Sequence, residues 1–508
     1  MFDILTPQQM GCAEQASVKL GTSLSELMDN AGARLYKEIY RSALSLSAKN
    51  VLLLIGKGNN GGDGLVAANL LFDAGFKVII YLPCGFPATD LSSAAYDKLN
   101  KTIPVICEDI EKLKDAVNMS QIIVDCVFGT GFHGDLRESI MPVFELIEKA
   151  KAYKIACDVP SGVNSLDGYA SKGTVHYNKT VTFHRAKIGM FLSPAKDFCG
   201  NIYVCDISIP EGWENDIDIS VEKPDLDCIR KLLPARNRNS HKGTYGKLML
   251  VCGCENYMGA PLISAKAALH SGVGITNLCT PKSVASALVS AAPECVFTGL
   301  LADNEGYIAA VNANKLVEMS KSSQAMVIGC GLGVSENTKA LVSQLIKSSE
   351  CPVILDADGI NCICENIDIL SKRKSEIILT PHPAELARLC SCSVDEILQD
   401  RLKYANALAR KYGVTVHAKG TQTFTVTENS CFITDFGNTA LAKGGSGDML
   451  AGLIGSFRAQ GLSGVNACIL SSAVMGSSAE YLSKNNSERS ILASDIISAF
   501  SKLFKEWE

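Results

Sequence analysis

The chain has 508 residues, of which 47% are hydrophobic and 20% charged, and its formal net charge is −5. A chain of this length buries more than one core, so we expect two or more domains. The slightly acidic balance argues against nucleic acid or an anionic membrane as a partner. The N-terminal residues lack a basic segment followed by an apolar one, which argues against a secretory signal.

Twenty cysteines are spread along the chain, many of them inside apolar runs. Three pairs have the spacing C-x-C, but no C-x-x-C and no cysteine–histidine cluster with zinc-binding spacing occurs. The pattern favours reduced, buried cysteines in a cytoplasmic protein. A disulfide framework is the weaker alternative, because a chain this long does not need one.

Helical patterns over 7–21 and 23–44 open the first half, and short apolar runs follow at regular intervals. These expected strands are 50–56, 77–83, 103–107, 121–127, 153–160 and 200–210. Amphipathic helical stretches separate them. Alternating strands and helices predict a parallel α/β sheet covered on both faces.

An acidic segment near 210–226 has few aliphatic residues and no helical period, so we interpret it as a linker. The second half then repeats the α/β rhythm, with strands expected in 247–253, 274–281, 325–333, 351–359, 375–383, 413–420 and 431–437. The uncharged run 459–479 is broken by polar residues and predicts a buried helix rather than a membrane span. We therefore expect two α/β domains, 1–218 and 225–508.

The stretch "IGKGNNGGDG", residues 55–64, follows an apolar strand and precedes a helical pattern. Backbone amides at such a helix start bind phosphate, and glycines allow close approach of a ligand. The spacing differs from the usual GxGxxG fingerprint. A tight turn in which Asn59 and Asp63 cap the helix explains the stretch equally well.

Two further glycine-containing loops, 125–137 and 158–168, also follow expected strands. The carboxyl ends of parallel strands meet at one edge of the sheet, where ligands bind. Each loop brings an oxygen donor, namely Asn60, Asp125 or Ser161, and such donors suit a hard cation. The alternative is that Asp125 and Asp158 only cap their loops.

"GKGNNGGDGLVAA", "DCVFGTGFHG" and "DVPSGVN" resemble the three loops of NAD(P)H-hydrate epimerases, and the resemblance extends over about residues 5–210. It implies a Rossmann-like fold, interconversion of the R and S hydrates of NADH and NADPH, and a potassium ion held by Asn60, Asp125 and Ser161. Asp158 is the catalytic residue that it implies. The implied substrate contacts are Asn59, Asn60, Gly61, Gly62, Asp63, Gly129, Thr130, Gly131, Phe132, His133, Gly134, Asp135 and Asp158. His133 stands at a variable position of the family.

In the second half, "LAKGGSGDMLAGLIGSF", residues 441–457, leads three glycines and a serine into a helix. Free amides there form an anion-binding site to which the helix dipole adds. Asp448 lies in the first turn, where it is able to accept a proton from a substrate hydroxyl. An aspartate at this position is usually only a cap, but the preceding glycines favour the functional interpretation.

Three other stretches carry candidate ligand contacts. His382 lies between two prolines, which hold it in an extended backbone. Lys419 precedes a tight turn in "AKGTQT", a combination that suits phosphate. Asp356 and Asp358 follow a strand, and they are as suited to capping the next helix as to holding a metal.

These motifs resemble the ADP/ATP-dependent NAD(P)H-hydrate dehydratase branch of the ribokinase-like superfamily, over about residues 225–505. The resemblance implies hydrate contacts at Ala260, Gly333, His382 and Asp448, the last being catalytic. It implies nucleotide contacts at Lys419, Gly420, Thr421, Gln422, Thr423 and Gly447. Gln422 and Cys330 depart from the usual pattern, which has glycine and proline there.

The two resemblances together predict a bifunctional repair enzyme for hydrated NADH and NADPH. Its cofactors are potassium in the first domain and magnesium with ADP or ATP in the second. A homo-oligomer is expected. The alternative is a ribokinase-like small-molecule kinase with a non-catalytic N-terminal binding module.

Overall fold

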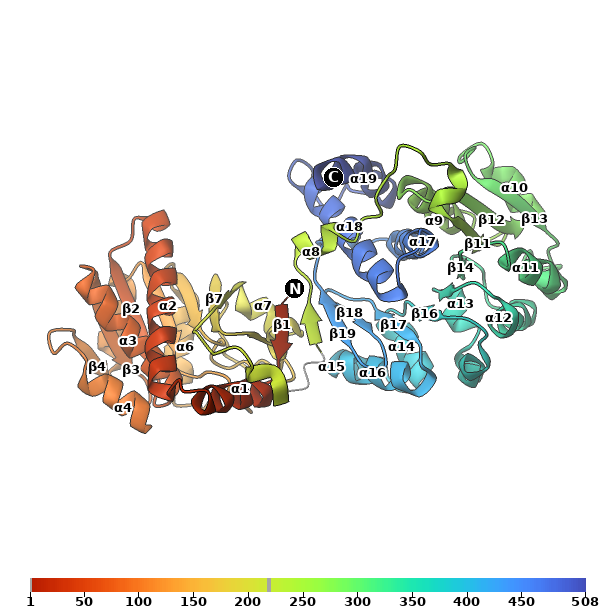
Figure 1. The fold of residues 1–508 in the computed structure, drawn as a ribbon. Coiled ribbons are helices and arrows are strands. Elements are labelled where there is room, and N and C mark those ends of the chain that lie inside the picture. The colour runs from red at the N-terminus through yellow and green to blue at the C-terminus, as the bar shows by residue number, and fades with distance from the viewer. Residues whose placement is uncertain (1, 217–220) are drawn as a thin grey trace. The chain divides into compact units, whose positions relative to one another are not determined.

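A computed structural model describes residues 2–216 and 221–508, so part of the expected linker lies outside the described residues. The contacts within the chain divide it into two units, residues 2–221 and 222–508. Each unit is an α/β structure (Figure 1), which confirms the expected fold class.

The sheet of the first unit has the strand order β4-β3-β2-β5-β6-β7-β9, and all neighbouring strands are parallel. The strands are β2 (Asn50–Ile55), β3 (Lys77–Leu82), β4 (Val105–Cys107), β5 (Ile122–Cys126), β6 (Tyr153–Cys157), β7 (Lys179–Phe183) and β9 (Asn201–Cys205). This is a Rossmann-like order, in which the chain direction across the sheet reverses between β2 and β5. Ligands bind at such a switch point, beyond the carboxyl ends of the strands.

Helices cover both faces of this sheet (Figure 1). They are α1 (Pro7–Lys19), α2 (Leu24–Leu46), α3 (Asn59–Asp73), α4 (Asp90–Asp97), α5 (Ile110–Met119), α6 (Met141–Lys149) and α7 (Ala195–Cys199). Successive side chains of β2 alternate between the faces. Leu53 packs into a core with α2 and α3, whereas Leu52 and Leu54 pack into a second core with α5 and α6. A short strand β1 (Phe2–Leu5) pairs with β8 (Ala186–Lys187).

The second unit contains the sheet order β13-β12-β11-β14-β15-β16-β17-β18-β19. The strands are β11 (Lys247–Val251), β12 (Ile275–Pro281), β13 (Val296–Leu300), β14 (Ala325–Ile328), β15 (Val353–Leu355), β16 (Ile377–Leu379), β17 (Thr415–Ala418), β18 (Thr423–Val426) and β19 (Cys431–Thr434), while β10 (Val221–Lys223) lies at the boundary of the units. Pairing is parallel as far as β17 and antiparallel through β18 and β19. The sequence pattern did not indicate β13 or β18, whose short runs contain glycine or threonine and lack a strong apolar period.

The helices of this unit pack around its sheet (Figure 1). They are α8 (Leu226–Arg230), α9 (Gly259–His270), α10 (Lys282–Leu288), α11 (Ala313–Ser320), α12 (Glu336–Ser348), α13 (Asp358–Asn361), α14 (Pro383–Cys390), α15 (Val394–Gln399), α16 (Arg401–Tyr412), α17 (Ser446–Ala459), α18 (Gly464–Ser483) and α19 (Ala493–Trp507). Helix α17 crosses α9 closely, since a Cβ on Gly452 would lie 2.2 Å from the Ser264 carbonyl oxygen. The uncharged run 459–479 forms most of α18, which is largely buried as expected.

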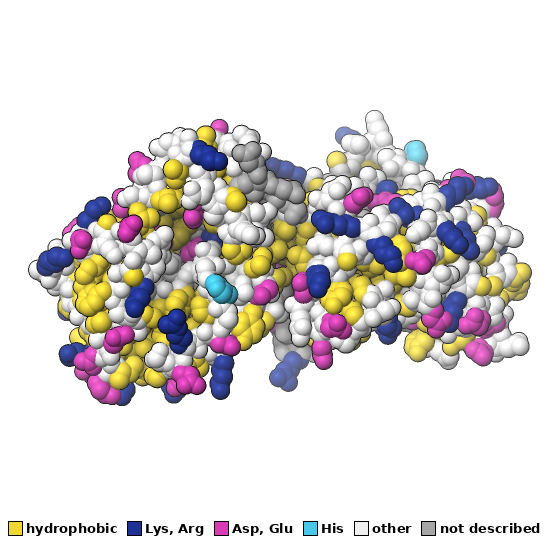
Figure 2. All heavy atoms as spheres, turned by 90° about the horizontal axis from the view of Figure 1, so that it is seen from below, with side chains coloured by type: hydrophobic (Ala, Val, Ile, Leu, Met, Phe, Trp, Pro, Cys, Tyr) yellow, Lys and Arg dark blue, Asp and Glu magenta, His cyan; other side chains and the backbone are white. Residues whose placement is uncertain are grey.

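All twenty cysteines are free thiols, and most are buried, so the expectation of unpaired cysteines is confirmed. Within the described ranges, no helix combines the length and the apolar character needed to cross a membrane. On the face shown in Figure 2, basic and acidic side chains are interspersed, with hydrophobic side chains between them.

The division of the chain leads to a first prediction. Fragments 1–218 and 225–508 will each fold alone, because each contains its own sheet and buried core. Each fragment should show a cooperative thermal transition by circular dichroism and a compact elution volume. A fragment that melts without cooperativity would contradict the independence of the two domains.

Candidate active sites

A cavity of about 840 Å³ opens at the carboxyl ends of β2, β5 and β6 in the first unit. The cavity lies at the switch point of the strand order, which is where ligands bind in sheets of this kind. The expected substrate contacts on its wall are Asn59, Asn60, Asp63, Gly129, Thr130, Gly131, Phe132, His133, Asp135 and Asp158. Gly61, Gly62 and Gly134 are not among the residues that line it.

The glycines of the β2–α3 turn are needed for packing inside the protein. A Cβ on Gly56 would lie 1.9 Å from the Val127 carbonyl oxygen, and one on Gly61 would lie 2.2 Å from the Gly56 oxygen. The N-cap of α3 is Gly58, which makes no side-chain cap. Asn59 instead accepts a hydrogen bond from the Thr89 hydroxyl at 2.6 Å. The alternative in which Asn59 and Asp63 cap the helix is therefore wrong.

The three expected ion ligands lie at adjoining loops. The Asn60 amide donates to the Phe128 carbonyl at 3.0 Å, while its buried Oδ1 has no partner among the described residues. The Ser161 hydroxyl donates to Asp125 Oδ1 at 2.8 Å and accepts from the Phe128 N–H at 2.9 Å. An orphaned oxygen within an all-oxygen donor set fits a hard cation.

Asp125 is fully buried and anchors these loops. Its carboxylate accepts hydrogen bonds from the N–H groups of Val127 and Ser161, each at 3.0 Å, and from the Tyr177 hydroxyl at 2.6 Å. Burial raises the pKa of Asp125, although these hydrogen bonds act in the opposite direction. Asp125 therefore has a structural role in addition to any contact with an ion.

Asp158 follows β6 with a positive φ of 61°, a conformation that a residue with a side chain rarely adopts. The ammonium of the buried Lys187 lies 2.5 Å from Asp158 Oδ1, and the Thr182 hydroxyl donates to the same oxygen at 3.0 Å. Glu14 and Asp63 also line this cavity.

Glu14 and Lys187 were not predicted from the sequence pattern. Lys187 lies within the run "FHRAKIGMFL", and a lysine inside an apolar run is a signal of a buried charge that requires a partner. Glu14 gave no comparable signal, because an acidic residue on an amphipathic helix is normally exposed. Only the fold brings α1 to the cavity.

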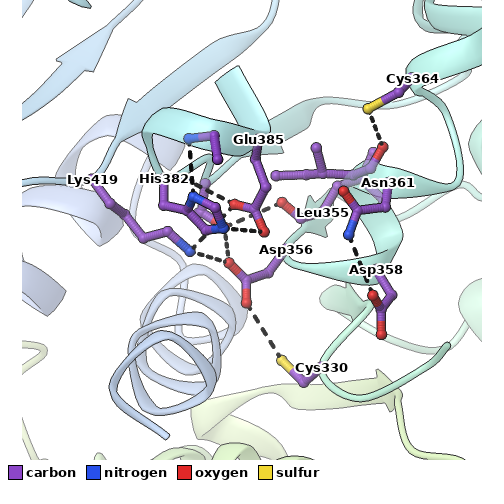
Figure 3. Close-up of polar contacts among 12 residues, drawn as sticks. Cys330, Leu355, Asp356, Asp358, Asn361, Cys364, His382, Glu385 and Lys419 are labelled. Carbon is purple, nitrogen blue, oxygen red and sulfur yellow. Dashed lines mark hydrogen bonds and ion pairs between the residues drawn. The ribbon is translucent and has the colours of Figure 1, made fainter. Parts of the chain in front are cut away.

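The site of the second unit is centred on Asp356, which follows β15 (Figure 3). The Lys419 ammonium lies 2.7 Å from Asp356 Oδ1, to which the Thr380 hydroxyl also donates at 2.6 Å. Ligand atoms of Cys330, Asp356 and Asp448 lie within 4.8 Å of one another. The two carboxylates are suitable ligands for magnesium, whereas a thiol is not.

Asp448 lies in the first turn of α17, as expected. Burial, and next the negative charge of Asp356, raises the pKa of Asp448 to about 6. A Cβ on Gly447 would lie 3.6 Å from Lys419 Nζ and 3.9 Å from Asp356 Oδ2, so the turn faces this cluster. The buried hydroxyl of Ser446 has no partner among the described residues, which leaves a donor free at the helix start.

His382 is the N-cap of α14, and its Nδ1 accepts a hydrogen bond from the Ala384 N–H at 3.1 Å. The Glu385 carboxylate accepts from the His382 N–H at 2.8 Å and also lies 3.9 Å from Lys419 Nζ (Figure 3). Burial, and then the charge of Lys419, lowers the pKa of His382, which keeps the imidazole neutral. The rigid presentation expected from the flanking prolines is thus reinforced by a capping box.

The expected nucleotide contacts Lys419, Gly420, Thr421, Gln422 and Thr423 form the turn between β17 and β18. Arg401 was not identified from the sequence, yet its guanidinium donates to the carbonyl oxygens of Lys419 and Gln422. It also lies 4.9 Å above the Phe424 ring. A Cβ on Gly420 would lie 1.8 Å from the guanidinium, so a side chain at this position would displace Arg401.

The two remaining expected hydrate contacts are Ala260, in the first turn of α9, and Gly333, in the loop after β14. A Cβ on Gly331 would lie 3.0 Å from the Ala260 Cβ, which places the β14 loop against α9. Asp358 accepts a hydrogen bond from the Gly333 N–H at 2.8 Å. Asp358 therefore holds this loop, and Asp356 is the aspartate that faces Asp448.

A family model described as NAD(P)H-hydrate dehydratase matches residues 248–502, and one described as YjeF-related protein N-terminus matches residues 24–189. The bifunctional NAD(P)H-hydrate repair enzyme Nnr of Thermofilum pendens is 35% identical over 456 residues, covering 88% of this chain and 86% of the relative. Nnr of Escherichia coli is 31% identical over 493 residues, and the match covers 96% of this chain and 91% of the relative. A similar solved structure is the ADP/ATP-dependent NAD(P)H-hydrate dehydratase from Bacillus subtilis, crystallised with ATP and Mg²⁺. The match covers 56% of this chain and 97% of the Bacillus subtilis chain, with 29% sequence identity and a TM-score of 0.48.

The chain has two α/β units, and each has a polar site at the carboxyl ends of its strands. This is the arrangement of an enzyme with two active sites. The similarity extends over both units and over nearly the whole of the relatives. The chain belongs to the family of bifunctional NAD(P)H-hydrate repair enzymes.

Proposed function

We propose that residues 1–218 epimerise the R and S hydrates of NADH and NADPH, and that residues 225–508 dehydrate the S hydrate at the expense of ADP or ATP. The observation that carries this proposal is the match to bifunctional repair enzymes across both units. The two sites divide the work, since one interconverts the hydrates and the other removes the S form.

In the dehydratase site, Asp448 accepts the proton of the substrate hydroxyl as its oxygen attacks the terminal phosphoryl group. The amides of the turn before α17 and the Lys419 ammonium stabilise the negative charge that develops on phosphate. The phosphorylated hydroxyl then leaves as phosphate while the ring loses a proton and regains its double bond. Magnesium bound with the nucleotide would neutralise phosphate charge, and Asp356 is the carboxylate that would hold it.

In the epimerase site, we assign the cavity at the ends of β2, β5 and β6 to the hydrate. Asn60, Asp125 and Ser161 would hold potassium, because Asn60 Oδ1 is buried without a partner among the described residues and all the donors are oxygens. The ion would supply positive charge beneath the substrate loops. Asp158 is the catalytic residue that we assign to this cavity.

The chain would work in the cytoplasm as a homo-oligomer, with small molecules rather than nucleic acids or membranes as its partners. The alternative is a kinase that retains its phosphorylated product, with a first unit that only binds ligands. Product analysis separates the two, because the proposed enzyme releases free phosphate with NADH from the S hydrate and a kinase does not.

Asp448→Asn should abolish dehydration while retaining nucleotide binding. Asparagine keeps the size of the side chain but cannot accept the proton, and loss of a general base costs about 10²–10⁴-fold in rate. Turnover of the S hydrate and nucleotide affinity should be measured on the same preparation. Near-normal turnover would refute the assignment of the base, and loss of affinity would indicate a metal-holding role instead.

Dehydration should also depend on pH through Asp448. The base acts in its ionised form, so kcat should be constant above pH 7 and fall below the pKa of about 6. The measurement is kcat between pH 5 and pH 8 at saturating hydrate, magnesium and nucleotide. A constant kcat down to pH 5 would contradict the raised pKa.

Asn60→Ala should remove the potassium dependence of epimerisation and lower its rate, while dehydration of the S hydrate persists. The substitution deletes the orphaned oxygen and removes only one hydrogen bond, to Phe128. Asp125→Ala is a poorer test, because it leaves buried donors of Val127, Ser161 and Tyr177 without an acceptor, each costing about 1–3 kcal/mol. Potassium titrations of epimerisation decide the matter, and an unchanged titration in Asn60→Ala would overturn the assignment of the ion.

A further inference from the structure

Four charged side chains from separate elements meet on the wall of the first cavity. Glu14 comes from α1, Asp63 from α3, Asp158 from the loop after β6 and Lys187 from β8. Three of them are carboxyl groups, and Lys187 is the cation that contacts Asp158 and acts on Glu14 and Asp63. Glu14 and Lys187 lie outside the three glycine-containing loops.

Lys187 is 1% exposed, and its ammonium is fully engaged. It donates to Asp158 Oδ1 at 2.5 Å, to the Thr182 hydroxyl at 2.9 Å and to the Phe183 carbonyl at 3.2 Å. An ammonium has only three donors. Lys187 therefore acts through Asp158, whose ionised form it stabilises.

Asp158 is held through only one of its two carboxylate oxygens. The described hydrogen bonds to its carboxylate, from Lys187, Thr182 and the Phe183 N–H, all go to Oδ1. Oδ2 accepts none of them, and Asp158 lines the cavity. A carboxylate fixed through one oxygen is suitably arranged to accept a proton with the other.

Glu14 and Asp63 have no comparable cation. Burial is the largest cause that raises the pKa of each, and the negative charge of Asp158 is the next. Lys187 opposes the shift in both cases. Carboxyl groups that share one cation resist ionising together, so Glu14 and Asp63 are the members of this cluster in which the protonated form is favoured.

The remaining charges around the cavity do not alter this balance. A potassium ion at Asn60 would bring one positive charge, and Asp125 would supply a matching negative charge. The other titratable side chains on the wall are Lys57, Cys84, Glu108, His133, Asp135 and Arg137. None of them appears among the causes that shift the pKa of Glu14 or Asp63.

The chemistry of the hydrates requires both an acid and a base. Water adds to an enamine at the carbon bonded to nitrogen, so the hydroxyl of the hydrate lies next to the ring nitrogen. Inverting that carbon requires the C–O bond to break and to form again on the opposite face. An acid must protonate the departing hydroxyl, and a base must deprotonate the incoming water.

We propose that the Glu14–Asp63 pair is the acid of the epimerase, that Asp158 is the base, and that Lys187 is a positioning residue for Asp158. This inference rests on the proposed epimerase function. It deepens that function by giving two residues outside the glycine-containing loops a part in the reaction.

The step is balanced in atoms and electrons. The acid pair gives a proton to the hydroxyl, the C–O bond breaks, and water leaves as the nitrogen lone pair forms an iminium double bond. A water molecule then adds to the other face, the double bond returns its electrons to nitrogen, and Asp158 takes the released proton. Exchange with solvent through the open cavity restores both protonation states. The reverse reaction exchanges the roles of the acid and the base.

The test supplies the R hydrate to the full-length chain with potassium, magnesium and nucleotide, adds excess separate dehydratase, and follows NADH. Glu14→Gln should lower epimerisation by about 10²-fold or more and move the alkaline limb of its pH profile to lower pH, because the acid loses its proton more readily without its partner. Lys187→Met should lower kcat of epimerisation and alter the acid limb of the pH profile, because it removes the cation that contacts Asp158 Oδ1.

The matched controls are Glu38→Gln and Lys179→Met. These residues form another buried ion pair of the same unit, at 3.2 Å, and neither lines the cavity. Both controls should retain the wild-type pH profile. The thermal transitions of each full-length variant, compared with wild type by circular dichroism, show whether the first unit is folded.

Three outcomes separate the claims. If wild-type protein does not epimerise the R hydrate, the proposed function fails. If it does, and Glu14→Gln and Lys187→Met keep the wild-type profile, the inference fails while the function stands. If Lys187→Met does not fold, Glu14→Gln still decides, since Glu14 lies partly exposed on α1 and makes no ion pair with the described residues.

Discussion

In both units a buried lysine is paired with an aspartate that follows a parallel strand. Lys187 binds Asp158 in the first unit, and Lys419 binds Asp356 in the second. Burying an ammonium without a partner is costly, so neither lysine is stable at its position without the carboxylate. Burial alone would lower the pKa of Lys419, but Asp356 and Glu385 raise it. These ion pairs keep a positively charged lysine and a negatively charged aspartate at the centre of each site.

Each pair also controls the protonation of its neighbours. One lysine neutralises one aspartate, and the remaining carboxyl groups are left in a partly desolvated site. Asp448 in the second unit and Glu14 and Asp63 in the first all have raised pKa values as a result of burial and of this nearby negative charge. The two units use the same electrostatic arrangement, although their sheets and loops differ.

The parallel strands and the loops that follow them could be predicted, because apolar runs such as 50–56 and 121–127 and their glycine-rich ends are local patterns. Asp448 was predictable for the same reason, since its helix start is visible in the sequence. Glu14, Lys187 and Arg401 were not predicted. Their roles come from contacts between distant segments, such as α1 with the cavity and α16 with the β17–β18 turn. Strands β13 and β18 were not predicted because both are short, and β13 contains a glycine.

The β2–α3 turn has a consequence for sequence variation in this family. Gly56 and Gly61 fit against the backbone so closely that any side chain would displace the β5 loop or the turn itself, whereas a Cβ on Gly58 would meet no atom within 4 Å. Natural variants should therefore be purged at Gly56 and Gly61 for reasons of steric fit, whereas the open space beside Gly58 belongs to the cavity that this residue lines. Invariance at Gly56 and Gly61 across homologues would thus report on the scaffold, and would carry no information about which hydrate the cavity accepts.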